Sequence, residues 1–291
     1  MSTPLPPTEQ RNPASGRLGS LSARDVIALM NTQEQQVLVA VEQATPLLVQ
    51  AAERVAGAFQ RGGRTAFIGA GTSGRIALQE AAELTPTFGV AKDSFLVLAA
   101  GGEFMGANAI TTSEDDTEAA PQALQANQIG PADVVIGLAA SGTTPFVRAG
   151  LQAARKAGAW TCAIANNPGA PLLADGDLGI VLDTGPEVLT GSTRLKAGTA
   201  QKLALNRITT CAMVLAGRVV ENHMVDLTCT TDKLRARAAR IVADLAGVDL
   251  ATARLRLQDA NWSVRDALTR AGYTVQRASP VPHTGAGGGA L

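Results

Sequence analysis

Two short loops, rich in glycine and in hydroxyl side chains, are the parts of this sequence best suited to hold a ligand. The first loop is "GAGTSG" at residues 69–74, and the second loop is "ASGTTP" at residues 140–145. Each follows an apolar run and precedes a helical pattern. Glycine lets a ligand approach the backbone, amide groups at a helix N-terminus point outward, and hydroxyl groups add donors without adding charge. The two loops together therefore indicate a phosphate site.

Other interpretations of these loops are less well supported. The first loop matches the GxGxxG pattern of dinucleotide sites, but no acidic residue closes the next strand in the manner that such sites require. It also lacks the Gly-Lys-Ser/Thr of a Walker loop. Taken singly, each loop is equally well explained as a helix cap, with Thr72 or Ser141 as the capping residue. Two such loops at one edge of a sheet make capping alone a less satisfactory explanation.

Carboxylates that could exchange protons occur in two places. Glu80 and Glu83 lie three residues apart and so share a helix face, which is usually a solvated face. A second group falls in a stretch without clear periodicity, where a charged surface loop is the simplest interpretation: Glu103, Glu114, Asp115, Asp116 and Glu118. General acid and base catalysis needs positioned groups of this kind. The pattern alone does not select a pair.

Basic residues gather at the entry to a later helix. Arg194 and Lys196 lie in the segment "TGSTRLKAGTAQK", where they could bind an anion, pair with Glu187 or simply be solvated. The two histidines, His223 and His283, are far apart in the sequence, and a lone histidine is more often structural than catalytic. The cysteines lack the CxxC spacing of a metal site and are interpreted as reduced core residues: Cys162, Cys211 and Cys229. We therefore expect no metal and no cofactor.

The hydrophobic pattern supplies a scaffold for the two loops. Five short apolar runs alternate with helical patterns: Thr65–Gly69, Ser94–Ala99, Asp133–Ala139, Thr161–Ala165 and Leu178–Leu182. Runs that are apolar on both faces are typical of parallel strands covered by helices on each side. We predict an α/β fold, a doubly wound three-layer sandwich with about five parallel strands. Ligands of such sheets bind at the carboxyl ends of strands, where both loops lie.

The remaining segments are expected to be helical or unstructured. We predict a flexible arm over residues 1–20, the sandwich with its N-terminal helices over 21–231, a small helical subdomain over 232–275 and a disordered tail over 276–291. Expected helices run from Ser22 to about Met30, from a cap at Thr32, from Thr45 to about Gln60 and over Leu195–Val219. Asp249 and Ser263 are expected N-caps in the C-terminal subdomain.

Composition excludes several classes of partner. The chain has 291 residues, of which 46% are hydrophobic, and its 25 basic residues balance its 25 acidic residues. This balance offers no basic field for nucleic acid and no polybasic segment for a membrane surface. The N-terminus lacks the pattern of a signal peptide, and no apolar run is as long as a membrane span of about 18 residues. We expect a cytoplasmic protein that captures any anionic ligand locally.

Taken together, the motifs resemble those of the N-acetylmuramic acid 6-phosphate etherase family, whose core is a sugar isomerase (SIS) domain. The matching segments are "TEQRNPAS" (8–15), "IGAGTSGR" (68–75), "PTFG" (86–89), "AAGGE" (99–103), "AASG" (139–142) and "GPEVLTGSTRLKAGTAQK" (185–202). The resemblance covers residues 7–232. The last segment is long and specific.

The resemblance implies that water cleaves the lactyl ether of N-acetylmuramic acid 6-phosphate, giving N-acetylglucosamine 6-phosphate and D-lactate during peptidoglycan recycling. It selects Glu83 as the acid that protonates the leaving ether oxygen and Glu114 as the base for C2 or for water. It also implies a homodimer without a cofactor, with sites near the interface. The residues that it places around the sugar phosphate are Gly71, Thr72, Ser73, Ser141, Gly142, Thr143, Thr144, Glu187, Ser192, Arg194 and Lys196.

The chain departs from the family pattern beside the two glutamates. Ala82 replaces the usual Ser, Leu84 and Thr85 replace Cys-Pro, Thr111 and Ser113 replace a Glu and an Ala, and Thr143 stands where Arg is common. These departures bear on substrate preference and rate more than on the class of reaction.

Three other functions are compatible with a SIS domain. A sugar-phosphate-binding regulatory protein of the glucokinase regulatory protein type would need both loops but not the two glutamates. An aldose-ketose isomerase is disfavoured by the long segment at 185–202. A transcription regulator would carry a basic recognition helix, which the N-terminal helices do not show.

Overall fold

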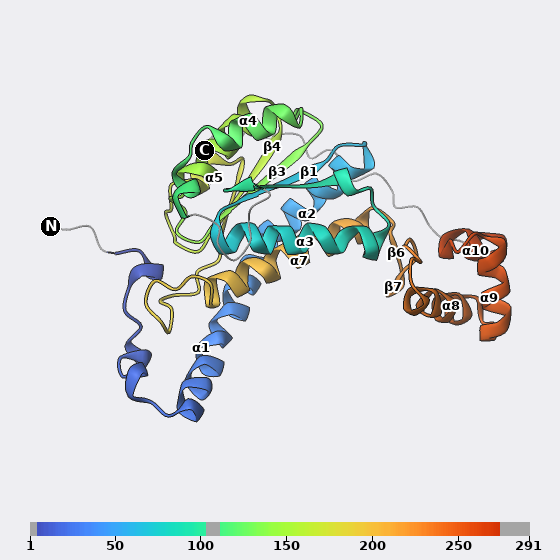
Figure 1. Ribbon diagram of the computed structural model, residues 1–291, viewed down its shortest axis with the longest axis horizontal. Helices are drawn as coiled ribbons and strands as arrows, with labels where there is room; N and C mark the ends of the chain where they lie inside the picture. The colour runs from blue at the N-terminus through green and yellow to red at the C-terminus, as the bar shows by residue number, and fades with distance from the viewer. Residues whose placement is uncertain (1–4, 103–110, 274–291) are drawn as a thin grey trace.

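The computed structural model describes residues 5–102 and 111–273, and its centre is a five-stranded parallel sheet (Figure 1). The strands are β1 (Thr65–Gly69), β2 (Phe95–Ala99), β3 (Val134–Ala139), β4 (Trp160–Ala165) and β5 (Leu178–Val181). Their order is β2-β1-β3-β4-β5, and every neighbouring pair is parallel. The predicted five-stranded α/β sandwich is confirmed.

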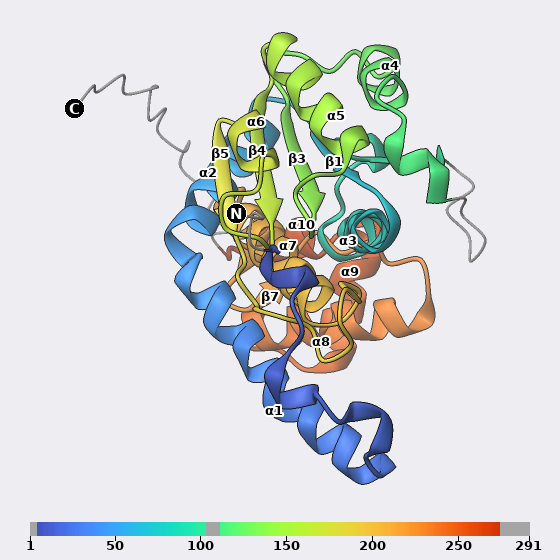
Figure 2. The same cartoon turned by 90° about the vertical axis from the view of Figure 1, so that its left-hand side faces the viewer.

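Helices cover both faces of this sheet, as the hydrophobic runs predict (Figure 2). One face packs against α2 (Thr45–Gln60), α3 (Gly71–Phe88) and α7 (Lys196–Leu215), and the other against α4 (Ala119–Ala126), α5 (Pro145–Lys156) and α6 (Leu172–Asp175). Side chains alternate along a strand, so Phe67 enters the first layer while Ala66 and Ile68 enter the second. Burial on both faces explains why these strands are almost entirely apolar, with Thr65 and Thr161 as exceptions near strand starts.

The N-terminal helices differ from the prediction in one respect. Helix α1 (Ala23–Gln43) is continuous, with Ser22 as its N-cap, whereas the sequence predicted a break near Met30. The hydroxyl of Thr32, which was expected to cap a second helix, donates instead to the carbonyl oxygen of Ala28 at 3.0 Å. A threonine hydroxyl can bond the preceding turn of its own helix, so Thr32 does not signal a new N-terminus.

Residues 5–20, expected to form a flexible arm, are attached to the rest of the chain at Thr8 and Asn12. They form three short 3₁₀ turns, η1 (Pro7–Glu9), η2 (Pro13–Ser15) and η3 (Leu18–Ser20). The side-chain amide of Asn12 donates to the carbonyl oxygen of Pro186 at 3.0 Å and to the amide oxygen of Gln33 at 2.7 Å. Prolines, serines and glycines in this segment suggested mobility, because composition does not show such partners.

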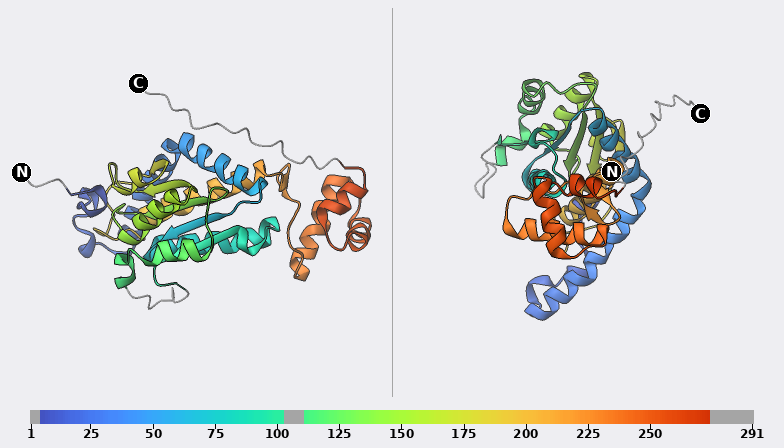
Figure 3. Two further views of the ribbon diagram at one scale, coloured as in Figure 1. Left: turned by 90° about the horizontal axis from the view of Figure 1, so that it is seen from above. Right: turned by 90° about the vertical axis from the view of Figure 1, so that its right-hand side faces the viewer.

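The C-terminal part forms its own small helical unit with a separate core (Figure 3). It contains α8 (Asp232–Ala246), α9 (Leu250–Asp259) and α10 (Val264–Arg270), and a hairpin of β6 (Val219–Val220) and β7 (His223–Met224) leads into it. Asp249 and Ser263 are N-caps, as predicted. Further short turns are η4 (Lys92–Ser94) and η6 (Thr111–Asp115). The tail predicted at 276–291 lies outside the described residues.

No helix in the described ranges, 5–102 and 111–273, is both long enough and apolar enough to cross a membrane. The described cysteines are free, with Cys162 buried and Cys211 and Cys229 half-buried.

Candidate functional site

The first and second loops lie side by side at the point where the sheet reverses its winding. Strand β1 has β2 on one side and β3 on the other, so the chain winds in opposite directions from this strand. The pairing register places Gly69 beside Leu138, so the two loops leave the sheet at the same height. Open α/β sheets bind ligands in the crevice at such a switch point. The topology thus brings the two sequence motifs into one candidate site.

Both helices that leave these loops begin without a side-chain cap. Helix α3 has Ala70 at its N-cap position and α5 has Thr144, and neither N-cap side chain accepts a hydrogen bond from the first turn of its helix. Thr72 and Ser141 therefore are not the N-caps of these helices, so the interpretation of the loops as helix caps at these two residues is wrong. The amide groups of an uncapped first turn carry partial positive charge and need acceptors. An anion such as a phosphate group satisfies that need.

Within the first loop, Thr72 and Ser73 have different surroundings. Thr72 is half-buried in the first turn of α3. Ser73 is buried, and its hydroxyl donates to the side-chain oxygen of Gln201 in α7 at 2.8 Å. Gln201 in turn donates to Asn166, and Asn166 donates to the carbonyl oxygen of Leu182. Ser73 thus anchors the loop to α7 and to the end of β5.

The second loop is held in a tight turn that leaves hydroxyls exposed. Gly142 has φ +70°, and a Cβ atom on it would lie 2.3 Å from the Cβ of Ala170, so only glycine fits. The Ser141 hydroxyl oxygen accepts from the backbone N–H of Thr143 at 3.2 Å and from its hydroxyl at 3.0 Å. Thr143 itself is exposed and Thr144 is half-buried.

A buried asparagine, Asn167, fastens residues 5–20 to the second loop. Its side-chain N–H groups donate to the carbonyl oxygen of Ser141 at 3.1 Å and to the hydroxyl of Thr8 at 2.9 Å. Its side-chain oxygen accepts from the backbone N–H of Thr8 at 3.0 Å. Sequence reasoning missed Asn167. The available signal was the pair of asparagines that directly follows an apolar strand.

The start of α7 is the third element next to the loops. A Cβ atom on Gly198 would lie 3.3 Å from the methyl carbon of Thr72, so the two helix starts are in contact. The carboxylate of Glu187, fully buried, caps α7 by accepting from the backbone N–H groups of Lys196 at 3.1 Å and Ala197 at 2.9 Å. Glu187 therefore orders the first turn of this helix.

Lys196 points away from solvent. Its ammonium group donates to the side-chain oxygen of Gln36 in α1 at 2.6 Å, and the residue is 1% exposed. Burial lowers the pKa of Lys196 and raises the pKa of Glu187, because it penalises the charged form of each group. Ser192 is half-buried and Arg194 is exposed in the loop before α7. Among the predicted basic binders, Arg194 is therefore the residue with free access to a ligand.

The structure separates the two glutamates of α3 that were expected to share a solvated face. Glu83 is exposed, whereas Glu80 is 7% exposed. Glu80 accepts from the hydroxyl of Thr209 at 2.5 Å and from the side-chain amide of Asn206, both in α7. Burial raises the pKa of Glu80. The expectation for Glu80 is wrong because α7 packs along this side of α3.

Glu83 and Glu114 occupy different places relative to the loops. Glu114 is exposed in η6, which follows β2 along the chain and packs against α5, so it lies at the same sheet edge as the loops. Glu83 is 11 residues beyond Thr72 in one helix. At about 1.5 Å per residue this separates the two Cα atoms by about 17 Å. That distance exceeds the span from the phosphorus to C2 of a hexose 6-phosphate.

Comparisons with known proteins agree with the observed fold. Residues 47–155 match the family described as glucokinase regulatory protein N-terminal SIS domain, and residues 108–210 match the SIS domain family. A phosphoheptose isomerase from Francisella tularensis superposes with TM-score 0.54 at 16% identity, over 67% of this chain and 100% of that chain. At this identity the likeness concerns the fold.

Curated relatives are much closer in sequence. A protein from Glaesserella parasuis is 47% identical over 237 residues, which is 81% of this chain and 77% of the relative. A protein from Deinococcus radiodurans is 45% identical over 261 residues, which is 90% of this chain and 86% of the relative. Both are named N-acetylmuramic acid 6-phosphate etherase.

Proposed function

We propose, from the premise that this chain belongs to the N-acetylmuramic acid 6-phosphate etherase family, a site and a mechanism for the reaction that the family name describes. The chain is an enzyme of this type: it cleaves the D-lactyl ether of N-acetylmuramic acid 6-phosphate. A purely regulatory role is less well supported, because the relatives that match most of the chain are etherases. The observation that carries the proposed site is the pair of uncapped helix N-termini at the switch point of the sheet.

The phosphate group is proposed to lie between the two loops. Backbone N–H groups at the start of α3 and α5 face it, and the hydroxyls of Thr72, Ser141 and Thr143 add donors. Ser73 supports the loop through Gln201. With the phosphate held there, the sugar extends toward Arg194 and Glu114, which are both exposed.

The proposed chemistry is an elimination followed by an addition. In the open-chain sugar the C1 aldehyde acidifies the proton on C2, and the carboxylate of Glu114 removes that proton. The electron pair forms a C2–C3 double bond while the C3–O bond breaks, and Glu83 donates a proton to the departing lactate oxygen. Water then adds to C3 and a proton returns to C2, which gives N-acetylglucosamine 6-phosphate. Oxidation states balance without an external oxidant or reductant.

The position of Glu83 supports a site shared between two copies of the chain. Glu83 is about 17 Å along α3 from the first loop, so a sugar anchored there is beyond its reach in the same chain. We propose that a homodimer brings Glu83 of a second copy to each pair of loops. Val49 on α2 and Val214 on α7, 44% and 49% exposed, line one apolar pocket and offer a surface for that contact. A role in peptidoglycan recycling and a cytoplasmic location complete the proposal.

The direct test is to incubate the purified protein with N-acetylmuramic acid 6-phosphate and to measure D-lactate. Release of D-lactate by the wild-type protein supports the activity, and its absence at high enzyme concentration contradicts it.

A second test addresses the shared site. Glu83→Gln and Glu114→Gln proteins, which are both expected to be nearly inactive, are mixed, dissociated and reassociated, so that heterodimers form. If the site is shared, each heterodimer holds one site with both substitutions and one intact site, and activity rises above that of either parent. Activity equal to the mean of the two parents would contradict the shared arrangement.

A further inference from the structure

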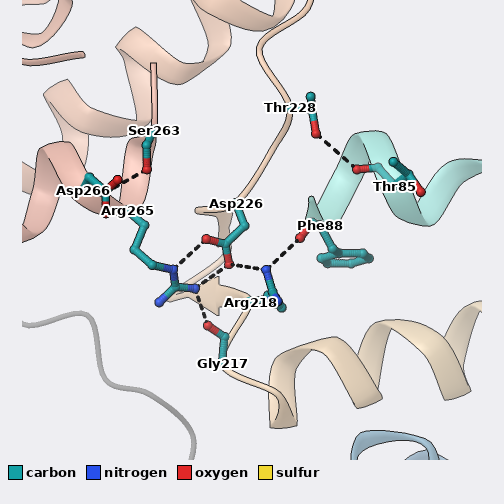
Figure 4. Close-up of polar contacts among 9 residues, drawn as sticks. All are labelled: Thr85, Phe88, Gly217, Arg218, Asp226, Thr228, Ser263, Arg265 and Asp266. Atoms are coloured by element: carbon teal, nitrogen blue, oxygen red, sulfur yellow. Dashed lines mark hydrogen bonds and ion pairs between the residues drawn. The ribbon is translucent and has the colours of Figure 1, made fainter. Parts of the chain in front are cut away.

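A half-buried carboxylate, that of Asp226, lies where the C-terminal unit meets the rest of the chain (Figure 4). Arg265 in α10 donates to this carboxylate through two nitrogens, with its Nε at 2.6 Å. The same guanidinium donates to the carbonyl oxygen of Gly217, just after α7, at 2.6 Å. Arg218 lies 3.5 Å from Asp226 on the other side. We call Asp226, Arg218 and Arg265 the Asp226 cluster.

The segment that contains Asp226 also lies against the last turn of α3. Gly89, with φ +60°, ends this helix, and a Cβ atom on it would lie 2.1 Å from the backbone oxygen of Asp226. Arg218 donates to the carbonyl oxygen of Phe88 at 3.5 Å. Thr228 donates to the carbonyl oxygens of Pro86 and Thr85, each at 3.4 Å. The Asp226 cluster is therefore in contact with the end of α3 at several points.

The last turn of α3 depends on such outside support. Pro86 has no N–H group, so the carbonyl oxygen of Ala82 loses its partner within the helix. Glu83, the next residue after Ala82, is exposed. A proline at this point also favours bending of the helix. The direction in which Glu83 projects thus depends on what holds the turn formed by Thr85 to Gly89.

The other side of the segment belongs to the C-terminal unit. Val225 and Leu227, 0% and 5% exposed, are part of the hydrophobic core that α8, α9 and α10 form. Two neighbouring residues, Asp226 and Thr228, contact the arginines and α3. The segment is thus bound to both parts, and movement of the C-terminal unit must move the end of α3.

We propose that the C-terminal unit is a positioning element for Glu83, acting through Asp226 and Arg265. This inference rests on the role proposed above for Glu83. Asp226 and Arg265 touch no substrate in this arrangement. Their effect is to hold the turn that follows Glu83, so that its carboxyl group reaches the leaving oxygen in the correct orientation. Misplacement of a catalytic group by about 1 Å can cost on the order of 100-fold in rate.

The test compares Arg265→Met with a matched control, Arg235→Met. Arg265→Met removes the contacts to Asp226 and Gly217 but leaves Arg218 to pair with the carboxylate, so no unpaired charge is buried. Arg235, exposed on α8, lies over the ring of Trp262 and does not touch α3 in the contacts described, so its loss perturbs the unit alone. We expect kcat to fall about 10- to 100-fold in Arg265→Met, with KM within about twofold, because the phosphate loops lie at the opposite end of α3. Arg235→Met should keep wild-type kcat.

Two further measurements separate positioning from loss of structure. Hydrogen exchange of residues 84–89 should accelerate in Arg265→Met and remain unchanged in Arg235→Met. Adding Arg265→Met to Glu83→Gln should lower the residual rate no further, because the effect passes through Glu83. If Arg265→Met does not fold, Arg265→Lys, which keeps the charge but not the two-nitrogen contact, provides the same comparison.

The outcomes are distinct. A wild-type protein that releases no D-lactate would contradict the proposed function before any variant is compared. An active wild type together with unchanged kcat in Arg265→Met, an equal loss in both arginine variants, or additive losses with Glu83→Gln would overturn the positioning role.

Discussion

Replacement of Glu80 is the perturbation whose consequences the structure defines most closely. This carboxyl group joins α3 to α7, where it accepts from Thr209 at 2.5 Å and from Asn206. Glu80→Ala would create a cavity and leave these two donors without their acceptor. The hydroxyl of Thr209 can still donate to the carbonyl oxygen of Leu205, which lies 3.0 Å away. The free energy lost at Thr209 is therefore at the low end of the range for a broken buried hydrogen bond. We expect the free energy of unfolding to fall by about 2 to 4 kcal/mol.

Glu80→Gln should behave differently, because glutamine has nearly the same volume and keeps an acceptor oxygen. Burial raises the pKa of Glu80 above its ordinary value of 4.5, so the folded protein binds this proton more tightly than the unfolded chain. The wild type is therefore fully stabilised by the neutral carboxyl below about pH 4.5 and loses that contribution as the pH rises through the higher folded pKa. A glutamine does not titrate. The stability of Glu80→Gln relative to wild type should thus increase with pH across this range.

The assay is urea unfolding followed by circular dichroism from pH 4 to pH 8, at one protein concentration so that the proposed dimerisation contributes equally to every measurement. Glu83→Gln, an exposed change one turn along the same helix, is the control and should alter stability by less than about 0.5 kcal/mol. A difference between Glu80→Gln and wild type that is flat or falls with pH would refute the reasoning. So would Glu80→Ala that is as stable as Glu80→Gln.

Three further predictions concern activity. Glu83→Gln and Glu114→Gln should each lower kcat by about 100- to 10,000-fold with little change in substrate affinity, which single-turnover kinetics and calorimetry can measure. Normal turnover in either variant would exclude the substituted glutamate as acid or base. Ser141→Ala should mainly weaken binding, by about 0.5 to 3 kcal/mol in calorimetry, since a hydroxyl that meets a charged phosphate is lost; unchanged affinity would remove Ser141 from the site. In ¹⁸O-labelled water the label should enter the sugar at C3, as mass spectrometry can detect, whereas label in the lactate would indicate displacement at the lactyl carbon and exclude the elimination.

The sheet and the site loops were predictable because their signals are local. A buried parallel strand must be apolar along its whole length, and a glycine-rich turn before a helix must be written in consecutive residues. The positions of Thr65–Gly69 and of the first loop therefore followed from short windows of sequence. The strand order in the structure then places the two loops together at a switch point.

The surroundings of single polar side chains were not predictable in this way. Glu80 and Glu83 are equivalent in a helical pattern, but α7 covers the first and leaves the second exposed. The sequence left open whether Lys196 binds an anion, pairs with Glu187 or is solvated, and in the structure it lies buried against Gln36 of α1. The burial of Glu80 and of Lys196 each depends on a partner that is more than a hundred residues away in the chain. The residues next to each of them in the sequence do not indicate that contact.

The sequence by itself determined the α/β class, the two hydroxyl loops and, through long matching segments, the family whose relatives are etherases. These properties depend on residue types at fixed spacing, which a chain displays before it folds. Only the tertiary structure decided that Thr8 is bonded to Asn167 beside the second loop, that α7 buries Glu80, and that the C-terminal unit meets α3 at Asp226. These contacts form when packing brings distant segments together. Burying a polar group without a hydrogen bond is costly, so most buried polar groups are bonded to a partner, which can come from any part of the chain.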